Sequence, residues 1–385
     1  MGKVSIEETL TSGVKEILPS KEALKKILES GKKLTIYNGI DPTGPSLHLG
    51  HLVVLRKLKD FQDLGHKIIL LIGDFTAKIG DPSGKISTRK TLTRKEVMNN
   101  AKDYKEQASK ILNFSGDNPA EIKFNSHWLS KLTFEEILKL AANFTSQQLL
   151  ERDMFQERLR SDKPIFLPEL FYPLLQGYDS VAMKVDIEVG GTDQIFNMLV
   201  GRDLVKKYLG KEKFVVSLKL LTVGEVKMGK TESVLIPLSF SAKEMFGKLM
   251  ALPDEALPSF FELLTDQDAP NLEPMEAKKL LARETLSQLF GEKEAKLAQE
   301  EFETVFQKGE TPKEAPTISL SSISSNATIL EALLKAGIVE SKSEIRRLII
   351  AGAVEDDKGK INDPNAKAQK GTYKIGKYRF LKVTS

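Results

Sequence analysis

Two short motifs, far apart in the chain, carry residue types that could bind and cleave a nucleoside triphosphate. His48 and His51 stand three residues apart where a helix is expected to begin, so both side chains fall on one face of its first turn. Imidazole N–H groups there can donate to phosphate oxygens whose negative charge grows in the transition state. Lys227 and Lys230 stand on either side of a glycine, and their charges can stabilise a pentacovalent phosphorus and the departing pyrophosphate. Together the motifs predict a site that transfers an adenylyl group.

Each motif also has a plainer interpretation. A histidine pair can lie on the surface or bind a metal ion, but a metal site needs further ligands, and none is evident near His48 and His51. The chain has no cysteine, which excludes disulfides, thiolate zinc sites and cysteine nucleophiles. A lysine–glycine–lysine loop is often only a solvated loop. The triphosphate site is therefore favoured mainly by the two motifs in combination.

A glycine-rich segment at residues 190–194 follows an expected strand, at the position where ligands bind in open α/β sheets. Asp193 could accept hydrogen bonds from ribose hydroxyls, and Gly191 would let the ribose lie close to the backbone. Alternatively, Thr192 or Asp193 caps the next helix. Both interpretations stay open, because one residue can serve in both ways.

Three polar residues share one face of an otherwise apolar helix. Tyr172, Gln176 and Asp179 are spaced four and three residues apart. Buried polar groups need partners, and a ligand with an amine and a hydroxyl would supply them, although bonds within the protein would also do so. Tyr37, on the first expected strand, and Asp81, after the second, are placed to line the same crevice.

The elements that must position these residues follow from hydrophobic periodicity. Residues 34–40 and 68–72 are short apolar runs typical of buried parallel strands. Between them, residues 48–64 have apolar positions at helical spacing, and Gly65 is expected to end that helix. This strand–helix–strand order, repeated to about residue 225, predicts an α/β fold with a doubly wound parallel sheet, as in Rossmann-like domains.

The pattern changes along the chain and predicts several parts. Residues 311–325 contain serine and proline and are expected to form a linker. Residues 241–310, which precede them, show helical periodicity with few strand signals. We expect a Rossmann-like domain at 1–240 with a helical insertion near 130–165, an α-helical domain at 241–310, a linker at 311–325, and a small α+β module at 326–385.

Charge is concentrated in the last part of the chain. Residues 326–385 hold 12 Lys and Arg against 7 Asp and Glu, a net charge of +5 in a chain whose total is +4. Lys342, Arg346 and Arg347 fall on the helix face away from Ile345 and its apolar neighbours. This pattern predicts either a polyanion partner or a solvated surface.

Two further expectations come from what the chain lacks. It has no run of about 18 apolar residues, so we expect no membrane association. Its first residues are acidic and have no apolar core segment, so we expect no signal peptide and a cytoplasmic location, which the absence of cysteine fits.

Taken in order, the motifs resemble those of bacterial tyrosyl-tRNA synthetases of class I, and the resemblance covers nearly the whole chain. The matching segments are residues 37–43, 48–51, 172–179, 190–194 and 227–231. The helical part resembles the anticodon-side domain of that family, and the tail resembles an S4-like RNA-binding module.

The resemblance implies an activity, partners and a role for each motif residue. Tyrosine and ATP would form tyrosyl-adenylate, and the tyrosyl group would pass to tRNA(Tyr). Mg²⁺ would arrive with ATP, no metal would have a site made by the protein, and the enzyme would be a homodimer. The implied catalytic residues are Thr43, His48, His51, Lys227, Lys230 and Thr231. Those implied for tyrosine are Tyr37, Asp81, Tyr172, Gln176, Asp179 and Gln194; for ATP, Gly39, Asp41, Gly50, Gly191, Asp193 and Lys230; and for RNA, Lys342, Arg346 and Arg347.

Two alternatives stay open from the sequence. A tryptophanyl relative would share the fold, although residues 41–43 and the pairing of Tyr37 with Asp179 favour tyrosine. A catalytically silent RNA-binding descendant of a synthetase would keep the tail, but the intact histidine and lysine motifs argue against it.

Overall fold

The computed structural model describes residues 4–82, 92–224, 226–228, 235–265, 267–304, 316–323, 327–339, 341–376 and 379–384. Contacts within the chain group it into two compact units, Met1–Glu292 and Lys293–Ser385. The boundaries expected near residues 240, 310 and 325 stay predictions. Helices that follow residue 240 belong to the first unit. Within the segment 311–325, expected to be a linker, the structure has a short strand, β9 (Thr317–Ser319), of the second unit's sheet.

The first unit is built on a six-stranded sheet in the order β1-β6-β5-β2-β3-β4. From β6 to β4 the neighbouring strands are parallel, and β1 is antiparallel to β6 at the edge. This confirms the expected α/β fold with a parallel sheet. The strands are β1 (Val14–Leu18), β2 (Thr35–Ile40), β3 (Lys67–Ile72), β4 (Glu121–Phe124), β5 (Ile187–Gly191) and β6 (Phe214–Leu218).

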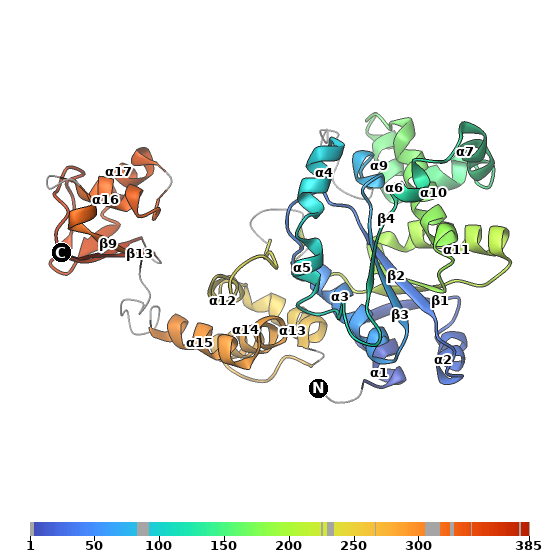
Figure 1. Ribbon diagram of the computed structural model, residues 1–385, viewed down its shortest axis with the longest axis horizontal. Coiled ribbons are helices and arrows are strands. Elements are labelled where there is room, and N and C mark those ends of the chain that lie inside the picture. The colour runs from blue at the N-terminus through green and yellow to red at the C-terminus, as the bar shows by residue number, and fades with distance from the viewer. Residues whose placement is uncertain are drawn as a thin grey trace. The chain divides into compact units, whose positions relative to one another are not determined.

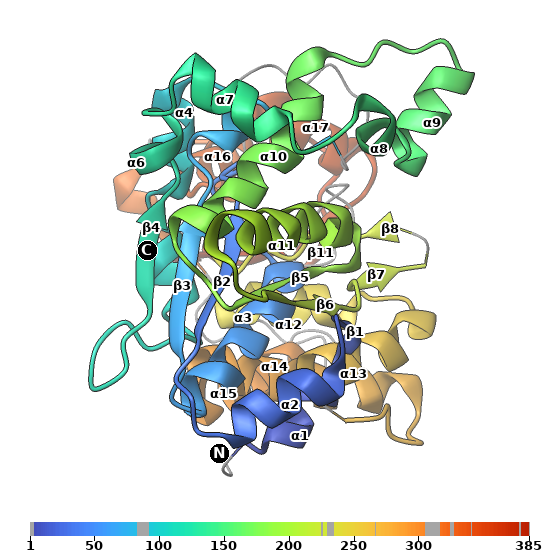
Figure 2. The ribbon, with the colours of Figure 1, turned by 90° about the vertical axis from the view of Figure 1, so that its right-hand side faces the viewer.

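Helices cover both faces of this sheet. The helix α3 (Leu49–Asp63) lies on one face, and α10 (Leu167–Ala182) and α11 (Ile195–Leu209) lie together on the other (Figures 1 and 2). The side chains of Leu52, Leu55 and Leu58 are fully buried, which confirms the helical spacing expected for α3. Since apolar layers lie on both sides, the central strands are nearly continuous apolar runs.

The sheet changes winding direction between β2 and β5. The chain leaves β2 toward α3 on one face, and it leaves β5 toward α11 on the other (Figure 2). The connections that leave the carboxyl ends of these two strands therefore diverge. They leave a crevice, which is where ligands bind in open α/β sheets.

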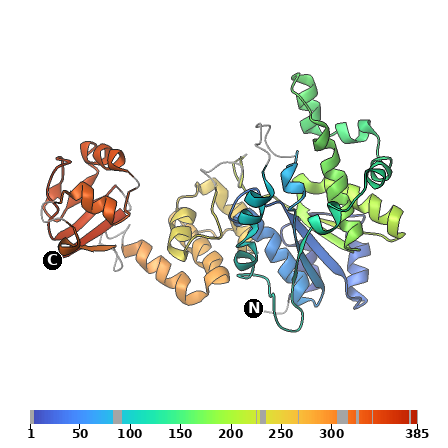
Figure 3. The same cartoon turned by 45° about the horizontal axis from the view of Figure 1, so that its top comes forward.

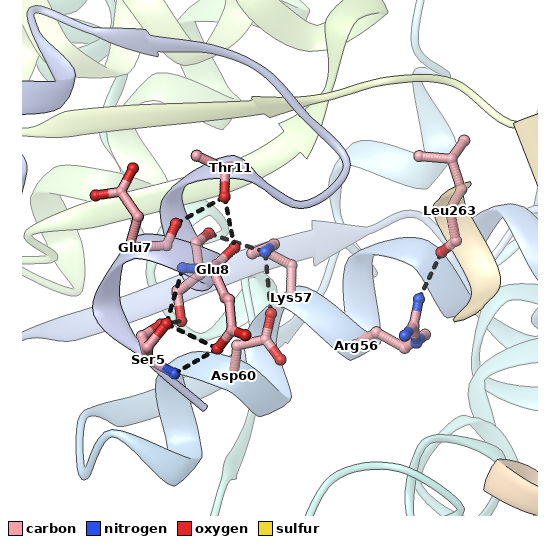
Figure 4. Close-up of polar contacts among 9 residues, drawn as sticks. Ser5, Glu7, Glu8, Thr11, Arg56, Lys57, Asp60 and Leu263 are labelled. Carbon is pink, nitrogen blue, oxygen red and sulfur yellow. Dashed lines mark hydrogen bonds and ion pairs between the residues drawn. The ribbon is translucent and has the colours of Figure 1, made fainter. Parts of the chain in front are cut away.

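The N-terminal segment packs on α3, away from its histidine end. In α1 (Ile6–Thr11), Ser5 and Glu8 cap the first turn reciprocally (Figure 4). The ammonium of Lys57 on α3 is buried and donates to the carbonyl of Thr9 at 2.8 Å and to Asp60 at 2.9 Å. A buried cation with two acceptors is stable there, so α1 is tied to α3. The next helix is α2 (Lys21–Glu29).

A second contact ties α3 to the helical end of the first unit. Arg56 donates through Nη1 to the carbonyl of Leu263 at 2.7 Å (Figure 4). That carbonyl lies in the last turn of α13 (Leu257–Thr265), where helix carbonyls lack intrahelical partners. The helix that begins with the histidine motif is thus held from two sides.

The remaining elements connect the sheet or follow it. Those between the strands are α4 (Arg94–Ala101), α5 (Tyr104–Ala108), α6 (Ser126–Leu129), α7 (Phe134–Ala141), α8 (Ser146–Leu150) and α9 (Asp153–Arg160). A short hairpin, β7 (Thr222–Val223) and β8 (Val226–Lys227), leads into the lysine motif. After it come α12 (Ala242–Met250), α14 (Pro274–Phe290) and α15 (Glu292–Phe302).

Among the helices of the described residues, none combines the length and the apolar content that crossing a membrane would require.

The second unit contains a small α+β module. Its five-stranded sheet has the order β11-β10-β12-β13-β9, and two helices pack on it around a core of apolar side chains (Figures 1 and 3). These elements are α16 (Ile329–Lys335), α17 (Lys342–Ile350), β10 (Val354–Asp356), β11 (Gly359–Lys360), β12 (Gly371–Ile375) and β13 (Arg379–Thr384). Ser341 caps α17 by accepting from the backbone N–H of Glu344.

Candidate active site

A cavity of about 300 Å³ lies where β2 and β5 end. Side chains from residues more than 180 positions apart in the sequence line it together. The residues of the predicted site that line it are Tyr37, Gly39, Asp41, Thr43, His48, Gly50, His51, Asp81, Tyr172, Gln176, Asp179, Gly191, Asp193, Gln194 and Lys227. Lys230 and Thr231, also predicted, lie outside the described residues.

The histidine motif forms the first turn of α3. His48 is the N-cap of this helix, and its Nδ1 accepts from the backbone N–H of Gly50 at 3.1 Å. The backbone N–H of His48 donates to Nδ1 of His51 at 3.1 Å. Because each Nδ1 accepts a hydrogen bond, the ring proton of a neutral imidazole lies on Nε2. The centroids of the two rings are 3.9 Å apart, and the ring planes are tilted by 43°. A Cβ at Gly50 would lie 3.0 Å from the His48 ring, so glycine leaves room for this cap.

Burial keeps both imidazoles neutral. Burial, followed by the charge of Lys227, lowers the pKa of His48 to about 4. Burial, followed by His48 and Lys227, lowers the pKa of His51 well below its usual value. At neutral pH each ring therefore offers one Nε2–H donor and no positive charge. Because the rings are uncharged, they do not attract a carboxylate of the protein, and their N–H groups can donate to phosphate oxygens.

The lysine motif reaches the cavity through Lys227. Its ammonium contacts Oδ2 of Asp193 at 2.6 Å. The other carboxylate oxygen, Oδ1, is buried and has no hydrogen-bond partner among the described residues. A Cβ at Gly191 would lie 2.6 Å from that same oxygen, so glycine is required beside it. The arrangement leaves one carboxylate oxygen of a cavity-lining residue without a donor among the described residues.

The segment that follows the lysine motif is hydrogen-bonded to the residues on either side of His48. The N–H of Leu49 donates to the carbonyl of Ile236 at 3.1 Å, and the N–H of Leu238 donates to the carbonyl of Leu47 at 2.7 Å. On the near side, Met228 is buried and lines the cavity. Both flanks of the segment that contains Lys230 therefore adjoin the first turn of α3.

A second polar cluster surrounds Tyr172 on α10. Its hydroxyl donates to Oδ2 of Asp41 at 2.9 Å, and Thr76 donates to Oδ1 of the same carboxylate at 2.6 Å. Burial, with the nearby carboxylates, raises the pKa of Tyr172 well above its usual value, so the hydroxyl stays protonated and donates. Both carboxylate oxygens of Asp41, which is expected to contact ATP, thus accept hydrogen bonds from protein hydroxyls, and its contact with ATP stays a prediction.

Gln194 joins two carboxylates of the site. Its Nε2 donates to Asp81 at 2.7 Å and to Asp193 at 3.3 Å. Its Oε1 accepts from Asn197 at 3.0 Å, and this bond fixes which end of the amide faces the carboxylates. The predicted tyrosine-binding and ATP-binding parts of the cavity thus meet at one side chain.

Asp179 lies at the closed end of the cavity. Its Oδ1 accepts from the indole N–H of Trp128 at 2.7 Å, and its Oδ2 accepts from the amide of Asn125 at 3.2 Å. Burial raises the pKa of Asp179 well above its usual range, and these two hydrogen bonds act in the opposite direction. A carboxylate held by two donors retains lone pairs that can accept from a ligand hydroxyl.

Gln176 and Tyr37 complete this end. Gln176 donates to Glu188 at 3.2 Å, whereas its Oε1 is buried without a hydrogen-bond partner among the described residues. The hydroxyl of Tyr37 shares a hydrogen bond of 2.8 Å with Ser180. Tyr37 is fully buried and lines the cavity.

Comparisons with known proteins agree with this geometry. The family model described as class I tRNA synthetases (W and Y) matches residues 29–307. A tyrosine–tRNA ligase of Carboxydothermus hydrogenoformans is 45% identical over 402 residues, which covers 98% of this chain and 97% of that protein. One of Thermotoga maritima is 41% identical and covers 97% of this chain and 96% of that protein.

The chain belongs to the tyrosine–tRNA ligase family of class I tRNA synthetases.

Solved structures support the fold of this synthetase. A truncated mitochondrial tyrosyl-tRNA synthetase of Aspergillus nidulans has a TM-score of 0.67 at 23% identity and covers 78% of this chain and 94% of that one. A tyrosyl-tRNA synthetase of Archaeoglobus fulgidus has a TM-score of 0.59 at 19% identity and covers 77% and 100%. The names of the curated relatives favour the tyrosyl interpretation over the tryptophanyl one.

Several residues that organise the synthetase's site were not found from its sequence. Asn125 and Trp128 hold Asp179, and Glu188 contacts Gln176. Asn125 directly follows β4, so the rule that ligands bind at the carboxyl ends of strands could have found it. Glu188 had a different signal, because a charged residue inside an apolar strand needs a buried partner.

The predicted RNA-binding residues of the synthetase lie in its second unit. Lys342, Arg346 and Arg347 are exposed on α17, and Ile345 and Ile349 on the same helix are fully buried. The charged face expected from the sequence is thus accessible to solvent.

Proposed function

We propose that this chain joins tyrosine to ATP and then transfers the tyrosyl group to tRNA(Tyr). In the first step an oxygen of the tyrosine carboxylate attacks the α-phosphorus, the bond to the β-phosphate oxygen breaks, and pyrophosphate leaves. In the second step a ribose hydroxyl of the terminal adenosine attacks the tyrosyl carbonyl, and AMP leaves. The family membership and the single cavity shared by both sets of predicted residues support this proposal.

The observation that carries the proposal is a pair of buried acceptors without partners. Oε1 of Gln176 and Oδ1 of Asp193 have no hydrogen-bond partner among the described residues, and both residues line the same cavity. Leaving such groups unpaired costs about 1–3 kcal/mol each. An ammonium group at the first and a ribose hydroxyl at the second would satisfy them. Tyrosyl-adenylate carries both groups in one molecule.

The tyrosine end would be read by hydrogen bonds. Asp179 would accept from the phenolic hydroxyl, and Tyr37 lines the same cavity. Asp81, Tyr172 and Gln176 would surround the ammonium group. An amino acid without the hydroxyl would leave buried groups of the site unpaired, which disfavours phenylalanine.

The nucleotide end would be held by donors and cations. The Nε2–H groups of His48 and His51, with the hydroxyl of Thr43, would donate to phosphate oxygens. Lys227, with Lys230 and Thr231 of the same motif, would stabilise the charge on the departing pyrophosphate. Positioning and charge stabilisation suffice here, because the substrate carboxylate is itself the nucleophile.

Mg²⁺ is proposed to bind with ATP. This cation keeps several waters and is usually held by phosphate oxygens with one or two carboxylates. Within the described ranges, no three histidine, aspartate or glutamate side chains gather into a metal site.

ATP–pyrophosphate exchange with each of the twenty amino acids tests the proposed function. We expect exchange that depends on tyrosine. Exchange with tryptophan and none with tyrosine would contradict the substrate, and tRNA binding without any exchange would indicate a silent RNA-binding protein. The cytoplasmic location expected from the sequence stays a prediction.

The second unit is proposed to bind tRNA through its basic helix. Replacing Lys342, Arg346 and Arg347 with alanine should weaken tRNA binding and reduce its salt dependence by about two to three counterions, because each phosphate contact releases about 0.7–0.9 of one. Tyrosine-dependent pyrophosphate exchange should stay unchanged. The measurements are tRNA affinity across a salt series and the exchange rate.

A matched control removes three exposed lysines far from this helix in the sequence. Alanine at Lys15, Lys26 and Lys32 changes the net charge by the same amount. If both triple variants lower tRNA affinity equally, the contribution is total charge and α17 is not the binding surface.

A homodimer is proposed to form through the helices between β4 and β5. Five large apolar side chains are exposed there, and such surfaces mark interaction sites. They are Phe134 at 74%, Leu138 at 53%, Leu159 at 54%, Phe166 at 63% and Leu167 at 67% of full exposure.

Charged substitutions on α7 test this interface. Sedimentation velocity should show a dimer for the unmodified chain and a shift toward monomer for Phe134→Asp with Leu138→Asp, because burying two carboxylates is costly. Leu272→Asp, at an equally exposed leucine elsewhere, should stay dimeric. A monomeric unmodified chain would contradict the proposal.

A further inference from the structure

A buried ion pair lies directly beneath the cavity. Lys213, which precedes β6, contacts Glu188 of β5, and the two side chains are 0% and 3% exposed. The Lys213 ammonium also donates to the carbonyl of Met198 at 3.1 Å. A Cβ at Gly201 on α11 would lie 2.6 Å from that ammonium, so the absence of a side chain there leaves room for it. The pair occupies a site shaped to hold it.

Stability alone does not explain this pair. Removing two charges from water is costly, and replacing a buried ion pair by apolar residues is often neutral or stabilising. Glu188, however, also lines the cavity and contacts two other polar side chains. Its Oε2 accepts from Ser180 at 3.4 Å, and its Oε1 accepts from Gln176 at 3.2 Å. The pair therefore connects to the surface that faces a ligand.

The contact with Gln176 decides how its amide is turned. An ionised carboxylate can only accept hydrogen bonds, so Glu188 holds the NH₂ end of the Gln176 amide. The oxygen end is then directed elsewhere, and it is the buried Oε1 that has no hydrogen-bond partner among the described residues. An ammonium group has three donors and no acceptor. The amide orientation therefore leaves an acceptor, and not a donor, available for such a group.

We propose that Lys213 is a positioning residue for the substrate's ammonium group, because it is the counter-charge of the buried Glu188 carboxylate, and Glu188 in turn holds the NH₂ end of the Gln176 amide and leaves the amide oxygen without a donor among the described residues. This inference rests on the proposed function. It assigns to a lysine outside every sequence motif a role in recognising α-amino acids.

Two substitutions should reverse the amide by different routes. In Lys213→Met, Glu188 is buried without a counter-charge and takes up a proton, so its hydroxyl can donate to Gln176. In Glu188→Gln, Lys213 still needs an acceptor, so the new amide turns its oxygen to Lys213 and its NH₂ to Gln176. In both variants the NH₂ of Gln176 can turn toward the substrate, where it meets another donor.

The experiment compares two ligands that differ in one group. Dissociation constants are measured for tyrosine and for 3-(4-hydroxyphenyl)propionate, which lacks the ammonium group. Both variants should weaken tyrosine binding about 10- to 100-fold, the scale of one hydrogen bond to a charged group. Binding of the propionate should change less than about threefold. Lys211→Met is the matched control, because Lys211 pairs with Asp186 outside the cavity lining, at 2.8 Å.

A double-mutant cycle locates the effect. With Gln176→Ala already present, Lys213→Met should cause no further loss in the preference for tyrosine over the propionate. Circular dichroism checks folding, and if Lys213→Met does not fold, the isosteric Glu188→Gln variant decides alone. Unchanged tyrosine binding, or an equal loss for both ligands, would overturn the inference. Absence of tyrosine-dependent exchange in the unmodified chain would instead overturn the proposed function.

Discussion

Replacing His48 with alanine is expected to slow adenylate formation by about 10²–10³-fold, the usual cost of one transition-state donor. Tyrosine affinity should stay nearly unchanged, because His48 would contact phosphate and not the amino acid. The imidazole is held for this role by the hydrogen bond from Gly50 to Nδ1, which leaves Nε2–H as the donor. Single-turnover formation of tyrosyl-adenylate and equilibrium binding of tyrosine measure the two effects.

The expected rate effect has a defined pH dependence. Burial lowers the pKa of His48 to about 4, so the imidazole stays neutral from roughly pH 6 to 8. The ratio of the unmodified rate to the alanine-variant rate should therefore be constant over that range. The same depressed pKa contributes stability above the unfolded-state pKa of about 6.5. That contribution is lost as the pH falls from there toward 4, because the unfolded chain binds the proton first.

A control must separate catalysis from helix capping, because His48 is also the N-cap of α3. Serine caps helices well but is too short to reach a phosphate from this position. His48→Ser should therefore lose as much rate as His48→Ala while keeping more thermal stability. Normal turnover in either variant would remove His48 from the catalytic residues.

Much of the frame around this site could be predicted from local patterns. The spacing of Leu52, Leu55 and Leu58 gave the face that α3 buries, and Gly65, with φ of 85°, ends the turn after it. The strand β3 was found because five of its six residues are buried, which produces a continuous apolar run. These signals are local, since each depends on residues within one element.

What could not be predicted depends on contacts between distant segments. The edge strand β1 contains Lys15 and Glu16, so it has no apolar run, and its pairing with β6 decides its conformation. Asp41 reads as part of a nucleotide motif, yet its carboxylate is engaged by Tyr172, which lies 131 positions later. Lys213 reads as a surface lysine until Glu188 is placed beside it. Hydrophobic periodicity does not show which distant residues a polar side chain will contact.

The network behind the cavity explains why the motif residues alone do not specify the site. Asn125 donates to both Thr76 and Asp179, and Thr76 donates to Asp41. The side chains proposed to read the two ends of tyrosine are therefore joined by hydrogen bonds outside the motifs. In a low-dielectric interior such a network is costly if it is only partly satisfied. Each member therefore constrains the orientation of the next.

Replacing Asp179 with alanine is expected to lower kcat/KM for tyrosine by about 10- to 100-fold in pyrophosphate exchange. The substrate hydroxyl would lose a hydrogen bond to a carboxylate, worth about 1.5–3 kcal/mol. The N–H groups of Trp128 and Asn125 would lose their present acceptor in the free and the bound enzyme alike, which lowers stability and does not enter the comparison of substrates. Phenylalanine has no hydroxyl to lose, so its kcat/KM should change less than about threefold, and the preference for tyrosine should fall by nearly the whole factor.

Comparing the two amino acids separates recognition of the hydroxyl from support of the fold. A carboxylate that only maintained the structure would, when removed, lower activity with tyrosine and phenylalanine equally, and that outcome would contradict the role given to Asp179. Asp186→Ala is the matched control, because this carboxylate accepts from Thr35 and Lys211 and does not line the cavity. It should leave the preference unchanged. Discrimination would then follow from where the carboxylate lies, because Asp179 lines the cavity and Asp186 does not.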